Sequence, residues 1–218
     1  MNQQLISKRK EDKHMTIKFH DGDLPKGLKL GDVIAVDTEA MGLELHRDQL
    51  CVVQLSDGSG VEHVVRLKRP EFDCPNLKAL LADPAVLKIF HFARFDVAMM
   101  KKWLGIECAP IFCTKIASKL ARTYTDRHGL KDVSRELCGA DMSKAQQSSD
   151  WGADKLTDAQ LEYAASDVLY LHEIREKLIV MLEREGRLEL AQACFDFLPK
   201  RADLDLAGWP ETDIFAHS

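Results

Sequence analysis

Two carboxylates near the start of the chain, Asp37 and Glu39, stand two residues apart at the end of an apolar run. Residues 33–37 (VIAVD) predict a β-strand, because most of them are β-branched. Side chains at positions i and i+2 of a strand point to the same face, so both carboxylates should project together. Their mutual repulsion would be relieved by a hard divalent cation, which prefers oxygen ligands. A solvated strand end can carry the same D-x-E pattern, so alone it indicates only a candidate metal site.

Three further residues extend this set. Asp96 follows a predicted strand and begins a predicted helix, where an acid can also act simply as a cap. Tyr163 and Asp167 lie four residues apart, hence on one face of the strongest predicted helix. An Asp beside the core costs free energy unless it is paired or binds metal, the simpler alternative being a bond from the Tyr163 hydroxyl. Together the four acids and the Tyr could clamp two metal ions that cleave a phosphodiester, with Tyr163 orienting the attacking water.

The elements that must position these residues can be read from hydrophobic periodicity. Strands are expected over residues 33–37, 50–55, 61–67 and 86–91, and helices over residues 75–82, 95–104, 114–122, 130–137 and 157–184. Asp57-Gly58 predicts a tight turn between the second and third strands. Thr157 and Gln160 form a capping-box pattern at the start of the longest helix. A last helix over residues 188–198 is expected to stop at Pro199. Strands followed by helices predict one α/β domain around a mixed sheet.

Composition limits the class of protein. The chain has 218 residues, 45% of them hydrophobic, a formal net charge of −5 and a pI of about 5.9. This length suits a single domain. A protein that holds nucleic acid by bulk charge would be basic, so any such contact must use local basic patches.

Cysteines and the N-terminus indicate a compartment. The six cysteines show no C-x-x-C pair, which argues against zinc and, without a secretion signal, favours reduced thiols in the cytoplasm. No run of about 18 apolar residues predicts a membrane span. Residues 1–14 are polar and charged, and we expect a disordered tail or an alternative start there. Residues 15–218 form the expected domain.

Four motifs in order carry a resemblance to a known family. They are VIAVDTEAMGLELHRDQLCVVQLS (33–56), IFHFARFDVAMM (89–100), SKAQQSSDW (143–151) and YAASDVLYL (163–171). The chain resembles the DEDD superfamily of 3′→5′ exonucleases, in the branch with Tyr in its third motif, and within it ribonuclease D. The resemblance spans roughly residues 30–182.

The resemblance implies an RNase H-like fold, a mixed β-sheet flanked by α-helices. It implies that two divalent cations, Mg²⁺ or Mn²⁺, are the cofactors. Asp37, Glu39 and Asp167 would hold one ion, and Asp37 with Asp96 the other. Tyr163 and Glu39 would position the attacking water, and the product would be a nucleoside 5′-monophosphate.

Substrate contacts follow partly from the resemblance and partly from local patterns. The loop at residues 122–131 combines cations, an aromatic residue and a glycine, and it is either a substrate-side loop or a solvated surface loop. Trp151 is either a contact or a core residue. The candidates for nucleic-acid binding are Thr38, Met41, Gly42, Leu43, His91, Phe92, Arg127, Lys144 and Trp151.

The sequence therefore predicts a 3′→5′ exonuclease acting on single-stranded RNA with a free 3′ end. A DNA-directed exonuclease of the same superfamily is one alternative, because the motifs are shared. A catalytically inactive nucleic-acid-binding module is the other, and the presence of all four acids with Tyr163 argues against it. Ribonuclease D proper carries helical C-terminal nucleic-acid-binding domains, and we expect no such separate domain here.

Overall fold

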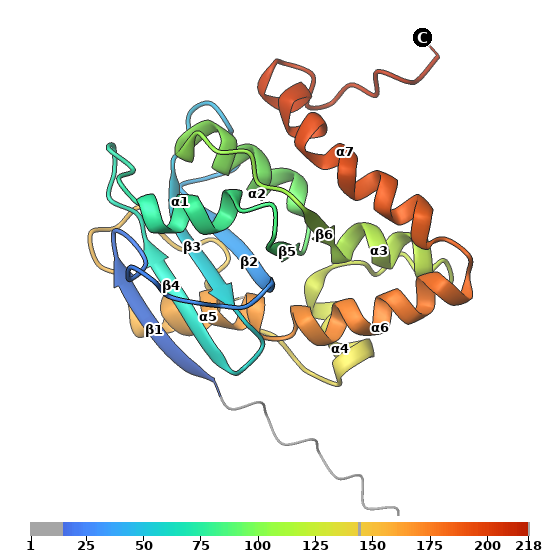
Figure 1. Cartoon of the computed structure of the whole chain (residues 1–218), viewed down its shortest axis with the longest axis horizontal. Helices are drawn as coiled ribbons and strands as arrows, with labels where there is room; N and C mark the ends of the chain where they lie inside the picture. Colours follow the sequence, from blue (N-terminus) through green and yellow to red (C-terminus); the bar gives the residue numbers. More distant parts are fainter. Residues whose placement is uncertain (1–14, 144, 218) are drawn as a thin grey trace, which may run out of the picture.

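A computed structural model describes residues 15–143 and 145–217 (Figure 1). The expectation for residues 1–14 and the candidate Lys144 therefore lie outside the described residues. Within the described part of the chain, no helix is both long and apolar enough to cross a membrane.

A six-stranded mixed sheet forms the centre of the domain, in the order β1-β4-β3-β2-β5-β6. Strands β2, β3 and β4 form an antiparallel meander, with the expected turn at Asp57-Gly58 between β3 and β4, whereas β1–β4, β2–β5 and β5–β6 pair in parallel. The four expected strands are confirmed, and the edge strands β1 and β6 were missed. The strands are β1 (Thr16–Asp21), β2 (Val33–Ala40), β3 (Leu50–Ser56), β4 (Val61–Arg66), β5 (Leu87–Phe90) and β6 (Ile111–Cys113).

Helices flank the sheet, as the predicted fold class requires. Helix α5 packs against β1 to β4, and α6 contacts β2 and β5 (Figure 1). Helix α2 continues as a π-helical turn, η1 (Met100–Leu104), and ends at Gly105 as expected. The α-helices are α1 (Pro75–Ala82), α2 (Ala93–Met99), α3 (Thr114–Ala121), α4 (Leu130–Cys138), α5 (Asp158–Leu169), α6 (Leu171–Arg184) and α7 (Leu188–Leu206).

The single helix predicted over residues 157–184 is wrong, because the chain forms two helices that meet at Tyr170. The predicted capping box is present: Thr157 Oγ1 accepts from the Gln160 amide, and Gln160 Oε1 accepts from the Thr157 amide at 2.9 Å. Ala164 and Ala165 of α5 pack with Trp151, whereas Val168 of α5 and the buried residues of α6 join the main core. The break at Tyr170 therefore lies close to where the buried contacts pass from the smaller cluster to the main core.

The predicted stop at Pro199 is also wrong, since α7 runs through this residue to Leu206. A proline inside a helix costs about 3 kcal/mol through the lost hydrogen bond and a steric clash. Burial offsets that cost, because Leu198, Pro199 and Ala202 are all buried. Arg94 of α2 also bonds Asp205 in the last turn of α7 at 2.7 Å.

The Asp205 ion pair yields a test of this packing. Asp205 is buried and bonds both Arg94 and Arg201, each at 2.7 Å. We expect Asp205→Ala to lower the free energy of unfolding by about 2–4 kcal/mol, because it strands two partly buried cations. Urea denaturation measures this.

Asp203→Ala is the matched control in the same helix. Its pairs are more exposed, so it should cost less than about 1 kcal/mol. Equal losses in the two variants would contradict an anchoring role for Asp205.

Candidate active site

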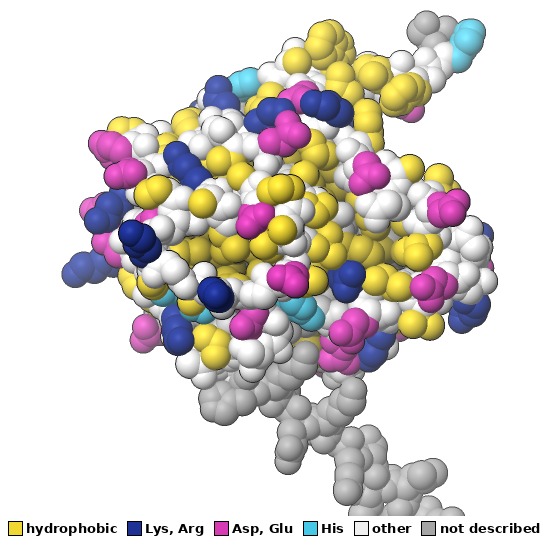
Figure 2. Space-filling model, viewed as in Figure 1, with side chains coloured by type: hydrophobic (Ala, Val, Ile, Leu, Met, Phe, Trp, Pro, Cys, Tyr) yellow, Lys and Arg dark blue, Asp and Glu magenta, His cyan; other side chains and the backbone are white. Residues whose placement is uncertain are grey.

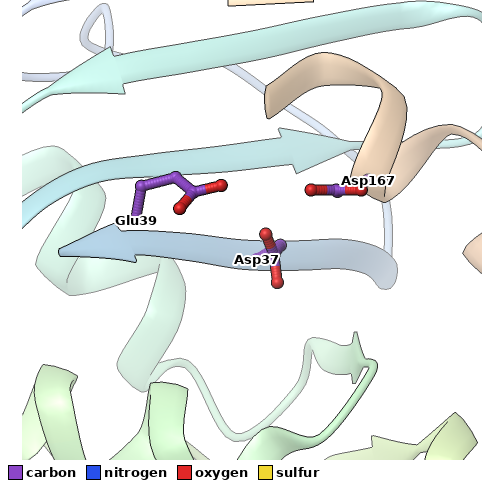
Figure 3. Close-up of side chains that lie close together, drawn as sticks. All are labelled: Asp37, Glu39 and Asp167. Atoms are coloured by element: carbon purple, nitrogen blue, oxygen red, sulfur yellow. The ribbon is translucent and has the colours of Figure 1, made fainter. Parts of the chain in front are cut away.

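Three predicted acids converge at one end of β2. One carboxylate oxygen from each of Asp37, Glu39 and Asp167 lies within 4.8 Å of the other two. Figure 3 shows Asp37 and Glu39 on β2 and Asp167 on α5, with the three carboxylates turned toward one another. The strand periodicity and the helix thus meet where the sequence predicted a metal site.

The fourth acid, Asp96, lies in the first turn of α2 and is buried. It lines the same cleft as the other three acids. The Thr38 hydroxyl donates a 2.6 Å hydrogen bond to Asp96 Oδ1. Because Thr38 lies between Asp37 and Glu39 on β2, this bond ties the start of α2 to the strand that carries the other acids.

Gln54 is a site residue that sequence reasoning did not single out. It pairs with Asp37 in the β2–β3 register, and its Nε2 donates to Asp37 Oδ2 at 2.7 Å. The Gln54 side chain is buried, and its Oε1 has no hydrogen-bond partner among the described residues. The sequence feature that could have indicated Gln54 is its position as the one polar side chain in the apolar run LCVVQL.

Burial and mutual repulsion disfavour ionisation of the acids. Burial raises the pKa of Asp37 well above its usual range, and the charges of Asp96, Asp167 and Glu39 raise it further. Burial, then Asp167 and Asp96, raise the pKa of Glu39 to about 9. Burial raises the pKa values of Asp96 and Asp167 to about 7, opposed by the Thr38 hydroxyl at Asp96 and by Tyr163 at Asp167.

No salt bridge within the described ranges reaches any of these four carboxylates. Buried carboxylates ordinarily pair with a cation or coordinate a metal. A cluster of oxygen atoms with no cationic side chain fits hard divalent ions.

The acids open onto a cleft of about 790 Å³. This volume falls in the range of small-molecule and cofactor sites. The cleft is lined by residues of β2, α2, α5 and the segments between them: Asp37–Leu43, His91, Phe92, Phe95, Asp96, Lys115, Gly129–Lys131, Met142, Ser143, Gln147–Ser149, Trp151, Tyr163 and Asp167.

Most predicted substrate residues line this cleft: Thr38, Met41, Gly42, Leu43, His91, Phe92 and Trp151. Leu43 is 82% exposed, Met41 53% and Phe92 46%, so the cleft wall presents apolar side chains to solvent. Trp151 lines the cleft but is almost fully buried and packs against the Tyr163 ring. Arg127 does not line the cleft.

The close approach of Gly42 to Asp48 shapes the segment after β2. A Cβ at Gly42 would lie 2.3 Å from Asp48 Oδ2, so only glycine fits. Asp48 accepts from the Glu44 amide at 2.9 Å, and the Met41 amide donates to Gln49 O at 3.0 Å. The resulting compact loop leaves the Leu43 side chain projecting.

His91 Nδ1 lies 2.9 Å from Thr114 Oγ1. Its Nε2 is buried and has no hydrogen-bond partner among the described residues. Burial lowers the pKa of His91 to about 3, and the Lys115 charge adds to the effect. His91 is therefore neutral at physiological pH.

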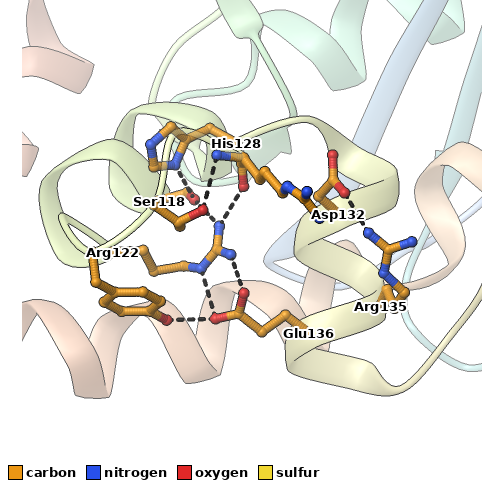
Figure 4. A network of polar contacts seen from close by, with 9 residues as sticks. Ser118, Arg122, His128, Asp132, Arg135 and Glu136 are labelled. Atoms are coloured by element: carbon orange, nitrogen blue, oxygen red, sulfur yellow. Dashed lines mark hydrogen bonds and ion pairs between the residues drawn. The ribbon is translucent and has the colours of Figure 1, made fainter.

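A polar network holds the loop that carries Arg127 (Figure 4). Arg122 is fully buried, and its Nη1 donates to Ser118 Oγ at 2.8 Å and to Arg127 O at 2.9 Å. Its guanidinium also pairs with Glu136. The anchored loop leads into Gly129–Lys131 on the cleft wall. Arg122 does not line the cleft, but it helps to fix this part of the wall by holding the loop.

Cleft residues that sequence reasoning missed include Phe95 and Met142. Gln147–Ser149 belong to the quoted motif at residues 143–151, which was the one available signal for them. On the face drawn in Figure 2, Lys and Arg side chains are interspersed with Asp and Glu. Basic contacts in the cleft are accordingly local.

Comparison with known proteins gives three results of consequence. A family model described as a 3′-5′ exonuclease matches residues 16–183. Ribonuclease D of Granulibacter bethesdensis is 38% identical over 155 residues, covering 71% of this chain and 39% of the relative. The chain thus spans about two-fifths of the length of the curated relatives it matches.

The third result comes from solved structures. Brucella melitensis NrnC bound to pGG is 56% identical, with a TM-score of 0.90, over 94% of this chain and 100% of that one. The same protein with bound Mg²⁺ is 54% identical, with a TM-score of 0.89, over the same shares. Escherichia coli RNase D is 28% identical, with a TM-score of 0.69, over 83% of this chain and 48% of that one.

These matches bear out the expected RNase H-like α/β fold of 3′-5′ exonucleases. The model match covers most of the chain, and it includes all four acids and Tyr163. The chain belongs to the ribonuclease D-like family of DEDD 3′-5′ exonucleases.

Proposed function

We propose that this protein is a metal-dependent 3′→5′ exoribonuclease that releases nucleoside 5′-monophosphates from short single-stranded RNA. The observation that carries the proposal is the convergence of Asp37, Glu39 and Asp167 within 4.8 Å, without a cationic partner in the described structure. Closely spaced carboxylates without a cationic partner are stabilised when a divalent cation binds between them.

Two divalent ions, Mg²⁺ or Mn²⁺, fit this donor set. Asp37, Glu39 and Asp167 would hold one ion, and Asp37 with Asp96 the other. Bound there, the ions would activate water and stabilise the charge that develops on the phosphodiester. The NrnC relative that binds Mg²⁺ supports this choice of metal.

The protein's own groups would supply orientation. Burial and the neighbouring acids raise the pKa of the Tyr163 hydroxyl, so it stays protonated and can donate a hydrogen bond to the attacking water. The carboxylate of Glu39 would accept a hydrogen bond from the same water. Gln54 would keep Asp37 turned toward the metals, since its amide occupies Asp37 Oδ2.

Exposed apolar side chains at the cleft favour a single-stranded substrate. Leu43 and Phe92 offer surfaces against which unpaired bases can stack, and Lys115 and Lys131 offer positive charge to phosphates. The NrnC relative bound to pGG supports a short RNA with a 5′-phosphate. A DNA-directed exonuclease would use the same acids, and only a comparison of the two substrates separates it from our proposal.

Residues 15–218 would form this catalytic unit. All six cysteines are free thiols, which supports action in a reducing compartment such as the cytoplasm.

The first prediction from the proposed function concerns activity. Matched 5′-labelled RNA and DNA oligomers, with pGG as the shortest RNA, should shorten from the 3′ end with Mn²⁺ or Mg²⁺ and stay intact in EDTA. RNA should be the faster substrate. Asp37→Asn should lose about 10³-fold in rate, because several kcal/mol of charge stabilisation disappear. Faster DNA cleavage would select the alternative, whereas binding of both oligomers without cleavage would favour an inactive module.

The second prediction concerns stability against pH without metal. The folded pKa values of Glu39, about 9, and Asp167, about 7, exceed the unfolded value of roughly 4. The folded state therefore binds more protons than the unfolded state. The contribution of these two carboxyl groups to the free energy of unfolding is complete below about pH 4 and is lost as pH rises through 7 to 9. The Tm in EDTA should fall between pH 6 and 9.

Asp37→Asn serves as the comparison, because it removes one repelling charge and should flatten that decline. Saturating Mg²⁺ should also flatten it. A wild-type Tm in EDTA that declines no more steeply than that of Asp37→Asn would contradict the assignment.

The third prediction concerns Gln54. Gln54→Met keeps the side-chain length but removes the donor to Asp37, so Mn²⁺ affinity measured by calorimetry should fall roughly 10–100-fold. The Tm in EDTA is the control for folding. Unchanged Mn²⁺ affinity in Gln54→Met would remove Gln54 from the site.

A further inference from the structure

A second cavity, of about 270 Å³, adjoins the catalytic cleft among α2, α3 and α7. It shares Phe92 and Lys115 with the cleft, so these two side chains form the wall between the two spaces. None of the four acids lines it. Its lining consists of Phe92, Arg94, Cys113, Lys115, Ile116, Lys119, Cys194, Phe197, Leu198 and Arg201.

The rim of this cavity carries an excess of positive charge. Arg94 and Arg201 share one carboxylate, that of Asp205. Lys115 and Lys119 have no salt bridge within residues 15–143 and 145–217. Lys115 and Lys119 therefore present unused donors to an anion.

The remaining lining is apolar and partly aromatic. Ile116, Phe197 and Leu198 come from α3 and α7, and the Phe197 ring is 39% exposed. Apolar surface together with a few convergent cations suits a ligand that has a flat ring at one end and a negative charge at the other.

One of the two residues that separate the cleft from the second cavity has a strained backbone. Phe92 has φ of 73°, a left-handed conformation that is costly for a bulky residue and is found mainly at functional sites. This conformation leaves the Phe92 ring half exposed, with Lys115 Nζ 4.3 Å from its centroid. One ring and one cation thus face both the cleft and the second cavity.

We propose that the second cavity binds a nucleotide, with its base against Phe197 and Ile116 and its phosphate toward Lys115 and Lys119. The choice of a nucleotide rests on the proposed function, since the adjoining cleft would hold and release nucleotides. The ligand is either a free nucleoside 5′-monophosphate or a nucleotide of the RNA strand that occupies the cleft. Both carry the same base and phosphate chemistry.

Cys194 provides a reporter that is independent of catalysis. It lines the cavity and is the one cysteine of the six that is not buried. The rate of its alkylation by iodoacetamide can be followed by mass spectrometry. At ten times the Kd of the ligand, roughly one cavity in ten stays open, so alkylation should slow about 10-fold.

Two ligands distinguish the two sources. GMP is added to the wild type with Mg²⁺, and pGG is added to Asp37→Asn with Mg²⁺ so that the RNA stays intact. Protection by GMP supports a site for free nucleotides. Protection by pGG but not by GMP supports a site for a nucleotide of the bound strand.

Lys119→Glu tests the charge of the rim, because Lys119 is exposed and lines only the second cavity. Lys119→Glu should abolish the protection of Cys194 from alkylation. Lys26→Glu makes the same charge change on the exposed β1–β2 connection and should preserve that protection. Protection by neither ligand, or protection unchanged in Lys119→Glu, would overturn the proposal. RNA hydrolysis is measured separately, so protection without hydrolysis would refute the exoribonuclease alone.

Discussion

The repulsion among closely spaced, partly buried carboxylates at the end of β2 is the constraint on which the rest of the site depends. Asp37, Glu39 and Asp167 are held close together where burial already disfavours their charged forms. A fold that only maximised stability would separate or neutralise them. The cost is tolerated because many surrounding contacts fix the acids, and because divalent cations can remove it.

Those contacts come from elements far apart in the sequence. The β2–β3 pairing brings Gln54 to Asp37, and the Thr38 hydroxyl ties β2 to Asp96 in α2. Helix α5 brings Tyr163 and Asp167 across one face of the sheet. Asp37 and Asp96 therefore each have a hydrogen-bond donor that holds them in place in the metal-free protein. A preorganised set of ligands loses less free energy when charge is bound between them.

Sequence reasoning recovered the parts of the structure that depend on local patterns. The D-x-E on a strand and the capping box at Thr157 and Gln160 are set by neighbours within four residues, and both are present. The helix through Pro199 and the break at Tyr170 were missed because burial of distant surfaces overrides local preference there. The three-residue strand β6 is too short to carry a periodic signal.

The same distinction holds at the site. Asp37, Glu39 and Asp167 could be assigned from their spacing and motifs, and the structure brings all three together. Gln54 could not, because its bond to Asp37 is a contact between two strands that no local pattern encodes. The polar residues of the motif at 143–151 lie between these cases: the motif marked the segment but gave no sign of which side chains line the cleft.

The position of β2 also determines where the chain can accept inserted residues. This strand is paired on both sides, with antiparallel β3 and parallel β5, and its register with β3 shifts only after Glu39. Because side chains alternate along a strand, one added residue before Asp37 would turn both acids to the opposite face. An added residue in the β1–β2 connection near Gly27, where nothing lies within 4 Å of the glycine, would displace none of the acids. Length variation among close relatives should therefore accumulate at such turns and be absent from the short stretch between Val33 and Glu39.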